Sequence, residues 1–162
     1  MLNPASRSVL RVTFEPSCFT PAKGVRPVQE SDRAALGQLM YHAYLGTVDY
    51  EGETEEQAAA EIARTFAGAY GTLNAAASQV FEQDGRILSA TLITTWQQRP
   101  FVAFSMTHPE AKNRGLARAC MRAAMGVLAS QGHRELRLVI TRVNAPALAL
   151  YTRLGFEVER EH

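Results

Sequence analysis

The chain has 162 residues, of which 46% are hydrophobic and 20% are charged, and its formal net charge is +1. These values are ordinary for one globular domain, and the near-neutral charge gives no general electrostatic reason to expect binding to nucleic acid or to an anionic membrane. Cys18 and Cys120 are far apart and form no C-x-x-C pair, so we expect neither a disulfide framework nor a zinc site. We see no signal peptide and no apolar stretch long enough to span a bilayer, so the expected compartment is the cytoplasm.

The first 22 residues stand apart from the rest of the chain. Alternating apolar and polar residues predict a strand over 9–15, and a connector with two prolines follows it. We therefore divide the chain into an N-terminal extension, residues 1–22, and a single domain, residues 23–162. The extra strand is expected either to cover an edge of the domain's sheet or to pair across a homodimer.

Two helices are predicted after a first short strand of the domain. Ser31 or Asp32 can cap the first helix, and Thr54 with Gln57 forms a capping box for the second. A loop with two glycines joins them. The expected bounds are 24–28 for the strand, 31 or 32 to 44 for the first helix and 54 to about 70 for the second. The apolar stripe expected on the second helix is Ala59, Ile62, Ala63 and Phe66.

The second half of the chain reads as strands followed by alternating helices and strands. Asp84 and Gly85 form a typical hairpin turn, and Gly132 and Gly155 stand where glycines commonly end helices. The expected strands are 78–83, 86–96, 101–107, 135–141 and 156–160, and the expected helices are 116–130 and 145–154. This order predicts an α/β (α+β) fold with a mixed, mostly antiparallel sheet and helices on both faces.

Charge is distributed unevenly along the chain. The stretch 34–63 contains no Lys or Arg, whereas most of the charged residues in the stretch 99–142 are Lys or Arg. One part could attract a cation and the other an anion, and two solvated faces would give the same pattern. The acidic residues of the first stretch are Asp49, Glu51, Glu53, Glu55, Glu56 and Glu61.

The turn before the helix at 116–130 meets the requirements of a diphosphate site. Gly115 allows close approach of a ligand to the backbone, and Ala117 keeps that surface small. The helix start presents free N–H groups and a positive dipole end, to which Lys112 and Arg114 add charge. A plain strand-to-helix turn would have the same glycine, and neither a Walker A loop nor a G-x-G-x-x-G fingerprint is present.

Two segments together resemble the GNAT superfamily of N-acetyltransferases. Residues 112–117 are similar to its R/Q-x-x-G-x-G/A motif, and residues 144–156 are similar to its N-x-x-A-x-x-L-Y-x-x-x-G-F motif with six positions in register. Lys112 stands where the family usually has Gln or Arg, Asn113 replaces a frequent glycine, and Ala117 replaces the last glycine. None of these changes removes a backbone donor.

The resemblance implies a fold, a cosubstrate and an activity. The parallel strands 101–107 and 135–141 should splay apart, with the pantetheine arm of acetyl-CoA in the gap and no metal. The implied activity is direct transfer of the acyl group to a primary amine within a ternary complex. The residues expected to contact the cosubstrate are Ser105, Met106, Thr107, Lys112, Asn113, Arg114, Gly115, Leu116, Ala117, Asn144 and Tyr151.

Tyr151 matches the family tyrosine that protonates the departing thiolate. A thiol has a pKa near 8.5 and a tyrosine about 10, so a neutral phenol needs little tuning for this role. The residues alone also allow a plain core position, because Tyr151 shares a helix face with Ala147, Leu150 and Leu154.

The general base and the acceptor are less well defined by the sequence. Some relatives carry Glu on the strand before the Asn motif, where this chain has Val139. The remaining candidates are Glu51 and Glu53, with Asp49 in the same loop, and His108. The loop combines carboxylates and tyrosines, which suits a small cationic amine or peptide amine, although an acidic segment before a helix would look the same.

Two alternatives stay open. The chain could be a GNAT-like sensor or assembly module that binds acyl-CoA without transferring it, or an enzyme that uses a longer acyl chain. The absent Glu favours the first of these slightly, and the retained Tyr151 favours catalysis.

Overall fold

The computed structural model describes residues 7–16, 21–47, 50–141 and 144–159. The strands are β1 (Arg7–Thr13), β2 (Val25–Pro27), β3 (Thr72–Leu73), β4 (Gln79–Gln83), β5 (Arg86–Trp96), β6 (Arg99–Thr107), β7 (Glu135–Thr141) and β8 (Glu157–Val158). The helices are α1 (Arg33–Tyr44), α2 (Glu55–Phe66), α3 (Leu116–Ser130) and α4 (Ala145–Arg153), with short 3-10 segments η2 (Glu30–Asp32) and η3 (Pro109–Ala111). One sheet joins the strands in the order β2-β4-β5-β6-β7-β1-β8, and β3 pairs with β5 outside this path.

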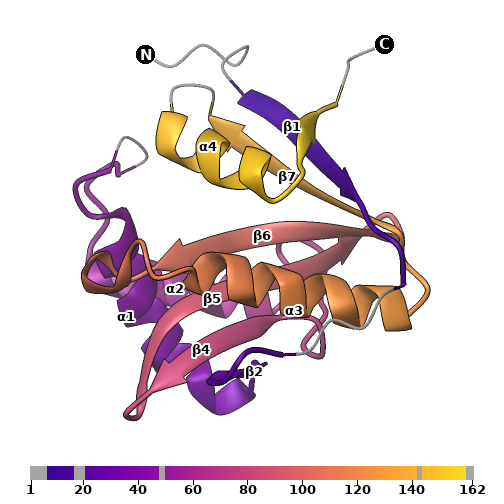
Figure 1. Ribbon diagram of the computed structural model, residues 1–162. Helices are drawn as coiled ribbons and strands as arrows, with labels where there is room; N and C mark the ends of the chain where they lie inside the picture. The colour runs from indigo at the N-terminus through magenta and orange to yellow at the C-terminus, as the bar shows by residue number, and fades with distance from the viewer. Residues whose placement is uncertain (1–6, 17–20, 48–49, 142–143, 160–162) are drawn as a thin grey trace.

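The sheet separates two layers of helices (Figure 1). On one face, α1 and α2 bury apolar side chains against β4, β5 and β6. On the other face, α3 and α4 share a core with β7 and β1. The described strand pairs are antiparallel except for β6 and β7, which are parallel. The expected fold class, a mixed and mostly antiparallel sheet with helices on both faces, is confirmed.

The predicted bounds of β5, α3 and β7 agree with the structure. Clear turn chemistry delimits them. Asp84 and Gly85 have φ angles of 52° and 75°, the positive pair that a type I′ hairpin between β4 and β5 requires. Gly132 follows α3 with a φ of 94°, a left-handed conformation that ends a helix at little cost for glycine.

Two expectations for α2 were wrong. The helix ends at Phe66 instead of near Tyr70, because Gly68 takes a φ of 96° that no helix continues. Ala59 is exposed. The backbone of α2 at Ala59 packs closely against Gly37 of α1, where an added Cβ would lie 3.0 Å from the Ala59 Cα. The buried residues of the helix are Ala58, Ile62 and Thr65.

β1 lies inside the sheet, between β7 and β8. It pairs with β7 along its whole length, with Arg7 opposite Thr141 and Thr13 opposite Glu135. Its other edge pairs with the two residues of β8. The N-terminal strand therefore covers the edge of β7 within the same chain. The final strand, expected over 156–160, is shorter than predicted, and the two-residue strand β3 was not predicted.

β6 and β7 diverge after a single paired position, as the family resemblance implied. Their parallel register contains one pair, Phe101 with Arg137. Just beyond it, Leu92 of β5 is opposite Phe104 while Ile93 is opposite Val102, which leaves one extra residue on β6. Such a bulge bends the strand that carries it, so β6 turns away from β7 and opens a gap.

Ion pairs fix the closed end of this gap. The Arg137 side chain is buried on the face opposite α4 and lies 3.2 Å from Glu159 and 3.0 Å from Glu135. Both carboxylates bind the same guanidinium, so β7 and the segment after β8 are held together where the splay begins.

A second charged cluster joins β2 to the start of α1, and it supports a prediction. Asp32 is 6% exposed and accepts two hydrogen bonds from Arg26, at 2.8 and 2.9 Å, and one from the Gln29 N–H at 2.7 Å. The Arg26 hydrogen bonds lower the pKa of Asp32. We expect Asp32→Asn to reduce the free energy of unfolding at pH 7 by about 2 kcal/mol, because charged hydrogen bonds are lost and Arg26 stays partly solvated.

The pH dependence of unfolding gives this prediction a direction. A depressed folded-state pKa contributes stability that is present above the ordinary value and is lost as the pH falls through the folded-state pKa. Urea unfolding should therefore separate wild type from Asp32→Asn at pH 7, and the difference should shrink at pH 3. Glu30→Gln removes an exposed pair with Arg33 and serves as the control, with an expected change below about 0.5 kcal/mol. Equal effects of the two variants would contradict the assignment.

Candidate active site

The gap between β6 and β7 exposes backbone groups of β6. Beyond Phe101 the described register joins β6 to β5 alone, so every second residue turns its N–H and C=O toward the open side. Met106 points its side chain into the core under α1 and α2. Ser105 and Thr107 alternate with it and therefore face the α3 and α4 layer. All three predicted β6 residues thus lie along the gap.

A strip of hydroxyl side chains crosses β5 and β6 beneath α3. Ser89 Oγ donates to the Met106 carbonyl at 3.0 Å and lies 3.0 Å from Thr107 Oγ1. Thr91 is opposite Ser105, is fully buried, and has no partner for Oγ1 among the described residues. Ser89 and Thr91 could not be predicted from the sequence, because the residues opposite β6 follow only from the bulged register.

The structure brings together two predicted site residues, Tyr151 and Ser105. Tyr151 lies on α4, is 8% exposed, and packs against Phe156 with ring centroids 5.6 Å apart. Burial raises the pKa of Tyr151, and a hydrogen bond with Ser105 opposes that rise. The side chain is therefore both a core residue and a neutral phenol beside the gap. The sequence left these two roles as alternatives, and the geometry allows both.

Asn144 begins α4 at the end of the segment that follows β7. Its side-chain oxygen accepts a hydrogen bond from the Ala147 N–H at 3.1 Å, and Pro146 occupies the first turn. The helix-capping role considered for Asn144 is confirmed. This cap sets the position of α4 and hence of Tyr151, about two turns further along the helix.

The turn before α3 has the backbone shape of an anion site. Gly115 caps the helix with φ 75°, and Asn113 has φ 66°. The first helical N–H bond is that of Ala119 to the Gly115 carbonyl, at 3.0 Å, so the preceding N–H groups have no partner within the helix. A Cβ on Gly115 would meet no atom within 4 Å. The space in front of these donors is therefore open to a ligand.

The side chains of this turn differ in their contacts. Lys112 and Asn113 are exposed. Arg114 donates to Gln83 Oε1 at 2.9 Å, and its guanidinium lies 5.8 Å from the centre of the Phe81 ring. Arg114 therefore covers β4 in this structure, while Lys112 adds charge at the turn.

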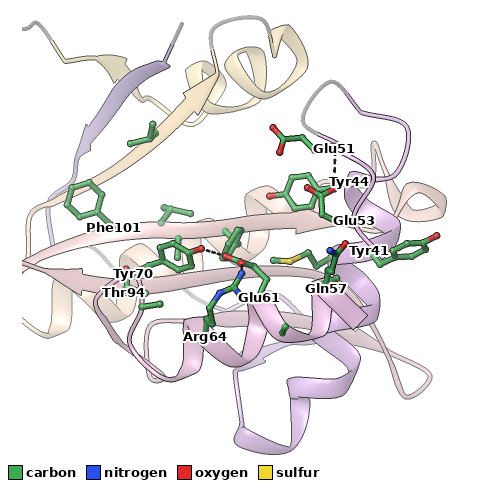
Figure 2. A pocket seen from close by; sticks show the side chains of 18 of the residues that line it. Tyr41, Tyr44, Glu51, Glu53, Gln57, Glu61, Arg64, Tyr70, Thr94 and Phe101 are labelled. Atoms are coloured by element: carbon green, nitrogen blue, oxygen red, sulfur yellow. Dashed lines mark hydrogen bonds and ion pairs between the residues drawn. The ribbon is translucent and has the colours of Figure 1, made fainter. Parts of the chain in front are cut away.

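A large groove lies on the opposite side of the splay, between α2, the loop before it, and β6 and β7 (Figure 2). Its volume is about 1440 Å³. Its wall holds four tyrosines, the single tryptophan of the chain, three glutamates and two arginines. These are Tyr41, Tyr44, Tyr50, Tyr70, Trp96, Glu51, Glu53, Glu61, Arg7 and Arg64. The apolar strand residues Phe101 to Phe104, Val139 and Ile140 complete the side nearest the gap.

The candidate bases divide between two places. Glu51 and Glu53 both line the groove, and Glu53 Oε2 accepts a hydrogen bond from the Glu51 N–H at 3.0 Å. His108 is not among the described lining residues; its Nδ1 accepts from the Glu110 N–H at 3.1 Å. Asp49 lies outside the described residues. Val139 is 51% exposed in the groove wall, so the strand position that holds Glu in some relatives carries no carboxylate here.

Comparison with models of protein families shows to which family the chain belongs. The model of the acetyltransferase (GNAT) family matches residues 38–156. The chain belongs to the GNAT family.

Individual relatives are more distant. Residues of the chain are 34% identical to streptothricin acetyltransferase of Streptomyces lavendulae over 68 residues, which is 42% of this chain and 36% of that protein. A GCN5-related N-acetyltransferase from Sphaerobacter thermophilus superposes with a TM-score of 0.70 at 19% identity, over 94% of this chain and 48% of that one. The PaiA N-acetyltransferase from Thermoplasma acidophilum, solved with coenzyme A, gives 0.65 at 17% identity, over 85% and 91%. These structures share the GNAT fold with the chain, which spans only about a third of the curated relative.

Within the described residues, no group of three or more His, Cys, Asp or Glu side chains is placed to hold a metal ion. No described helix is long and apolar enough to cross a membrane.

The turn before α3 allows a prediction with a matched control at the other end of the helix. Gly115 and Gly132 flank α3, both have positive φ, and a Cβ on either would meet no atom within 4 Å. Gly115→Ala and Gly132→Ala should therefore each cost about 1 kcal/mol of stability from backbone strain. Only Gly115→Ala should also weaken acetyl-CoA binding, by about tenfold, since its methyl group would stand before the helix N–H groups. Calorimetric titration with acetyl-CoA measures the affinity of each variant, and chemical unfolding measures its stability. Equal acetyl-CoA affinities of the two variants would refute a cosubstrate site at this turn.

Proposed function

We propose that the chain is an acetyl-CoA-dependent N-acetyltransferase that acts by direct attack of a primary amine within a ternary complex. One observation carries the proposal: the gap between β6 and β7 has the buried Tyr151 beside the half-buried Ser105 on one side and the groove on the other. A thioester held in that gap would face a proton donor from α4 and an amine from the groove. Family membership and the coenzyme A found in PaiA support the choice of cosubstrate.

The residues around the gap fit the parts of acetyl-CoA. The free N–H groups at Leu116 and Ala117 suit a diphosphate, and the open space at Gly115 admits it. The unpaired backbone of β6 beside Ser105 can bind the amide groups of a pantetheine arm as a neighbouring strand would. Asn144 stands at the start of α4, on the other side of the same gap.

Acyl transfer then needs four actions from the protein. A β6 N–H polarises the thioester carbonyl and stabilises the oxyanion as the amine nitrogen bonds to the carbonyl carbon. Holding both reactants in the gap replaces an encounter in solution. The C–S bond breaks as Tyr151 gives its proton to the sulfur. The amine loses a proton through Glu51 or Glu53, directly or through water, and Tyr151 is reprotonated from solvent.

The rival proposal is an acyl-CoA-binding module without transferase activity, which Val139 in the groove wall favours. A thiol-release assay with acetyl-CoA over a panel of alkylamines, polyamines, amino sugars, amino acids and peptides separates the two. We expect thiol release that depends on at least one amine, with the acetylated amine detected by mass spectrometry. Saturable acetyl-CoA binding without any amine-dependent release would favour the binding module.

A further inference from the structure

Glu61 forms a polar cluster in the groove, two turns along α2 from the loop that holds the candidate bases. Its Oε2 pairs with Arg64, and its Oε1 accepts a hydrogen bond from the Tyr70 hydroxyl (Figure 2). The Tyr70 ring packs edge-on against Phe104, with ring centroids 5.8 Å apart. Tyr70 thus links the cluster to the strand that borders the gap.

The cluster has capacity for another donor. A carboxylate has about four lone-pair sites, and the contacts with Arg64 and Tyr70 use two of them. The Arg64 side chain is 60% exposed while that of Glu61 is 19% exposed, so their ion pair is solvated and weak on the Arg64 side. An incoming ammonium group can therefore join or replace Arg64 at little cost.

The same wall of the groove contains a buried hydroxyl group without a hydrogen-bond partner among the described residues. Thr94 lines the groove, is fully buried, and has no hydrogen-bond partner for Oγ1 among the described residues. A buried hydroxyl without a partner costs free energy that a bound donor or acceptor would recover. Thr94 does not belong to the acidic cluster, so it points to a polar ligand group at this place independently.

Charge and aromatic content define the chemical class. The groove wall contains the carboxylates Glu51, Glu53 and Glu61 and the cations Arg7 and Arg64. Carboxylates thus outnumber cations, and the tyrosine and tryptophan faces of the wall attract cations further. Glu61 lies roughly 9 Å along α2 from its first residue, Glu55, at a rise of about 1.5 Å per residue. Glu51 and Glu53 precede that first residue, so the carboxylates of the groove wall come from two segments, the loop before α2 and the helix itself.

We propose that the acceptor carries two amino groups: one loses a proton and reacts as the free amine at the gap, and the second binds as an ammonium group to Glu61, Tyr70 and the Thr94 hydroxyl. Glu61 and Tyr70 are then specificity-determining residues for a diamine or polyamine acceptor. The inference rests on the proposed function, since it names the substrate class for that activity. An amino acid is disfavoured at this place, because its carboxylate would lie beside that of Glu61, the less exposed member of the pair with Arg64.

Trp96 allows a binding test that needs no turnover. It is the only tryptophan of the chain, is 51% exposed and lines the groove, so its fluorescence reports occupancy there. Three probes of equal length are titrated without acetyl-CoA: 1,8-diaminooctane, n-octylamine and 8-aminooctanoic acid. We expect the diamine to bind at least tenfold more tightly than the monoamine, and the amino acid no more tightly than the monoamine. Equal affinities of diamine and monoamine would overturn the proposal.

Variants then assign the preference to the cluster. Glu61→Gln should remove the tenfold advantage of the diamine, since a charge-assisted hydrogen bond is worth about that factor. Glu56→Gln makes the same change on an exposed part of α2 outside the groove wall and should keep the advantage. Tyr70→Phe retains the ring against Phe104 and should reduce the advantage about threefold. If Glu61→Gln does not fold, the diamine preference of Tyr70→Phe tests the assignment in its place. An unchanged preference in folded Glu61→Gln contradicts the assignment.

The outcomes also separate this inference from the proposed function. Diamine selectivity without acetyl transfer to any amine would retain the site and reject the transferase. Acetyl transfer by a protein whose Trp96 fluorescence shows no diamine preference would retain the transferase and reject the two-ammonium acceptor.

Discussion

Tyr151→Phe should lower kcat about a hundredfold and leave acetyl-CoA affinity within about twofold of wild type. In the proposed mechanism the phenol is the proton donor to the leaving sulfur, and loss of a general acid typically costs a factor of this size or more. The phenyl ring can keep the contact with Phe156, and the loss of the Ser105 hydrogen bond should cost about 1 kcal/mol of stability. Steady-state kinetics and calorimetric titration test the two parts.

The pH dependence of wild-type turnover is a second readout of the same residue. Burial raises the pKa of Tyr151, so the phenol stays protonated at the pH values at which a free tyrosine would begin to ionise. We expect any fall in kcat from ionisation of this group to begin at a higher pH than a free tyrosine would give. The assignment of Tyr151 would be wrong if Tyr151→Phe turned over at the wild-type rate.

Gly71→Ala should reduce the free energy of unfolding by about 3 kcal/mol or more. Gly71 has a φ of 101°, and a Cβ there would lie 2.4 Å from the Thr95 carbonyl oxygen, which is backbone and cannot rotate away. The β3 edge would have to move off β5, and Tyr70 with it. Chemical unfolding gives the loss in stability directly.

Gly85→Ala is the control for this loss. Gly85 also has a positive φ, of 75°, but a Cβ there would meet no atom within 4 Å. The control should lose only the strain of the left-handed backbone, about 1 kcal/mol. If Gly71→Ala were no less stable than Gly85→Ala, the close approach of β3 to β5 would be wrong.

Sequence patterns predicted the elements whose ends carry explicit turn chemistry. β5 begins after the Asp84-Gly85 hairpin and α3 ends before Gly132, so their bounds agreed with the structure. The end of α2 was missed because apolar residues continue past Phe66, while a conformational change at Gly68 stops the helix. β3 has two residues and no periodic pattern to detect.

The candidate site divides in the same way. Tyr151, Asn144 and Gly115 could be predicted as site residues because short motifs fix their place relative to a helix end. The Thr91 hydroxyl and the Glu61–Tyr70 contact were not found, because each depends on register or on packing between separate segments. Family motifs therefore predicted the proposed cosubstrate side of the gap, and only the three-dimensional structure showed the groove cluster on the other side.

The measurement that tests the central claim most directly is amide hydrogen exchange with and without acetyl-CoA. The claim is that the gap between β6 and β7 is the cosubstrate site. Peptides that cover residues 103–107 and 113–118 should exchange more slowly when acetyl-CoA is bound, because the ligand accepts from backbone N–H groups that the fold leaves open. The peptide that covers β3 should not change. Saturation with acetyl-CoA without protection of either segment would contradict the account.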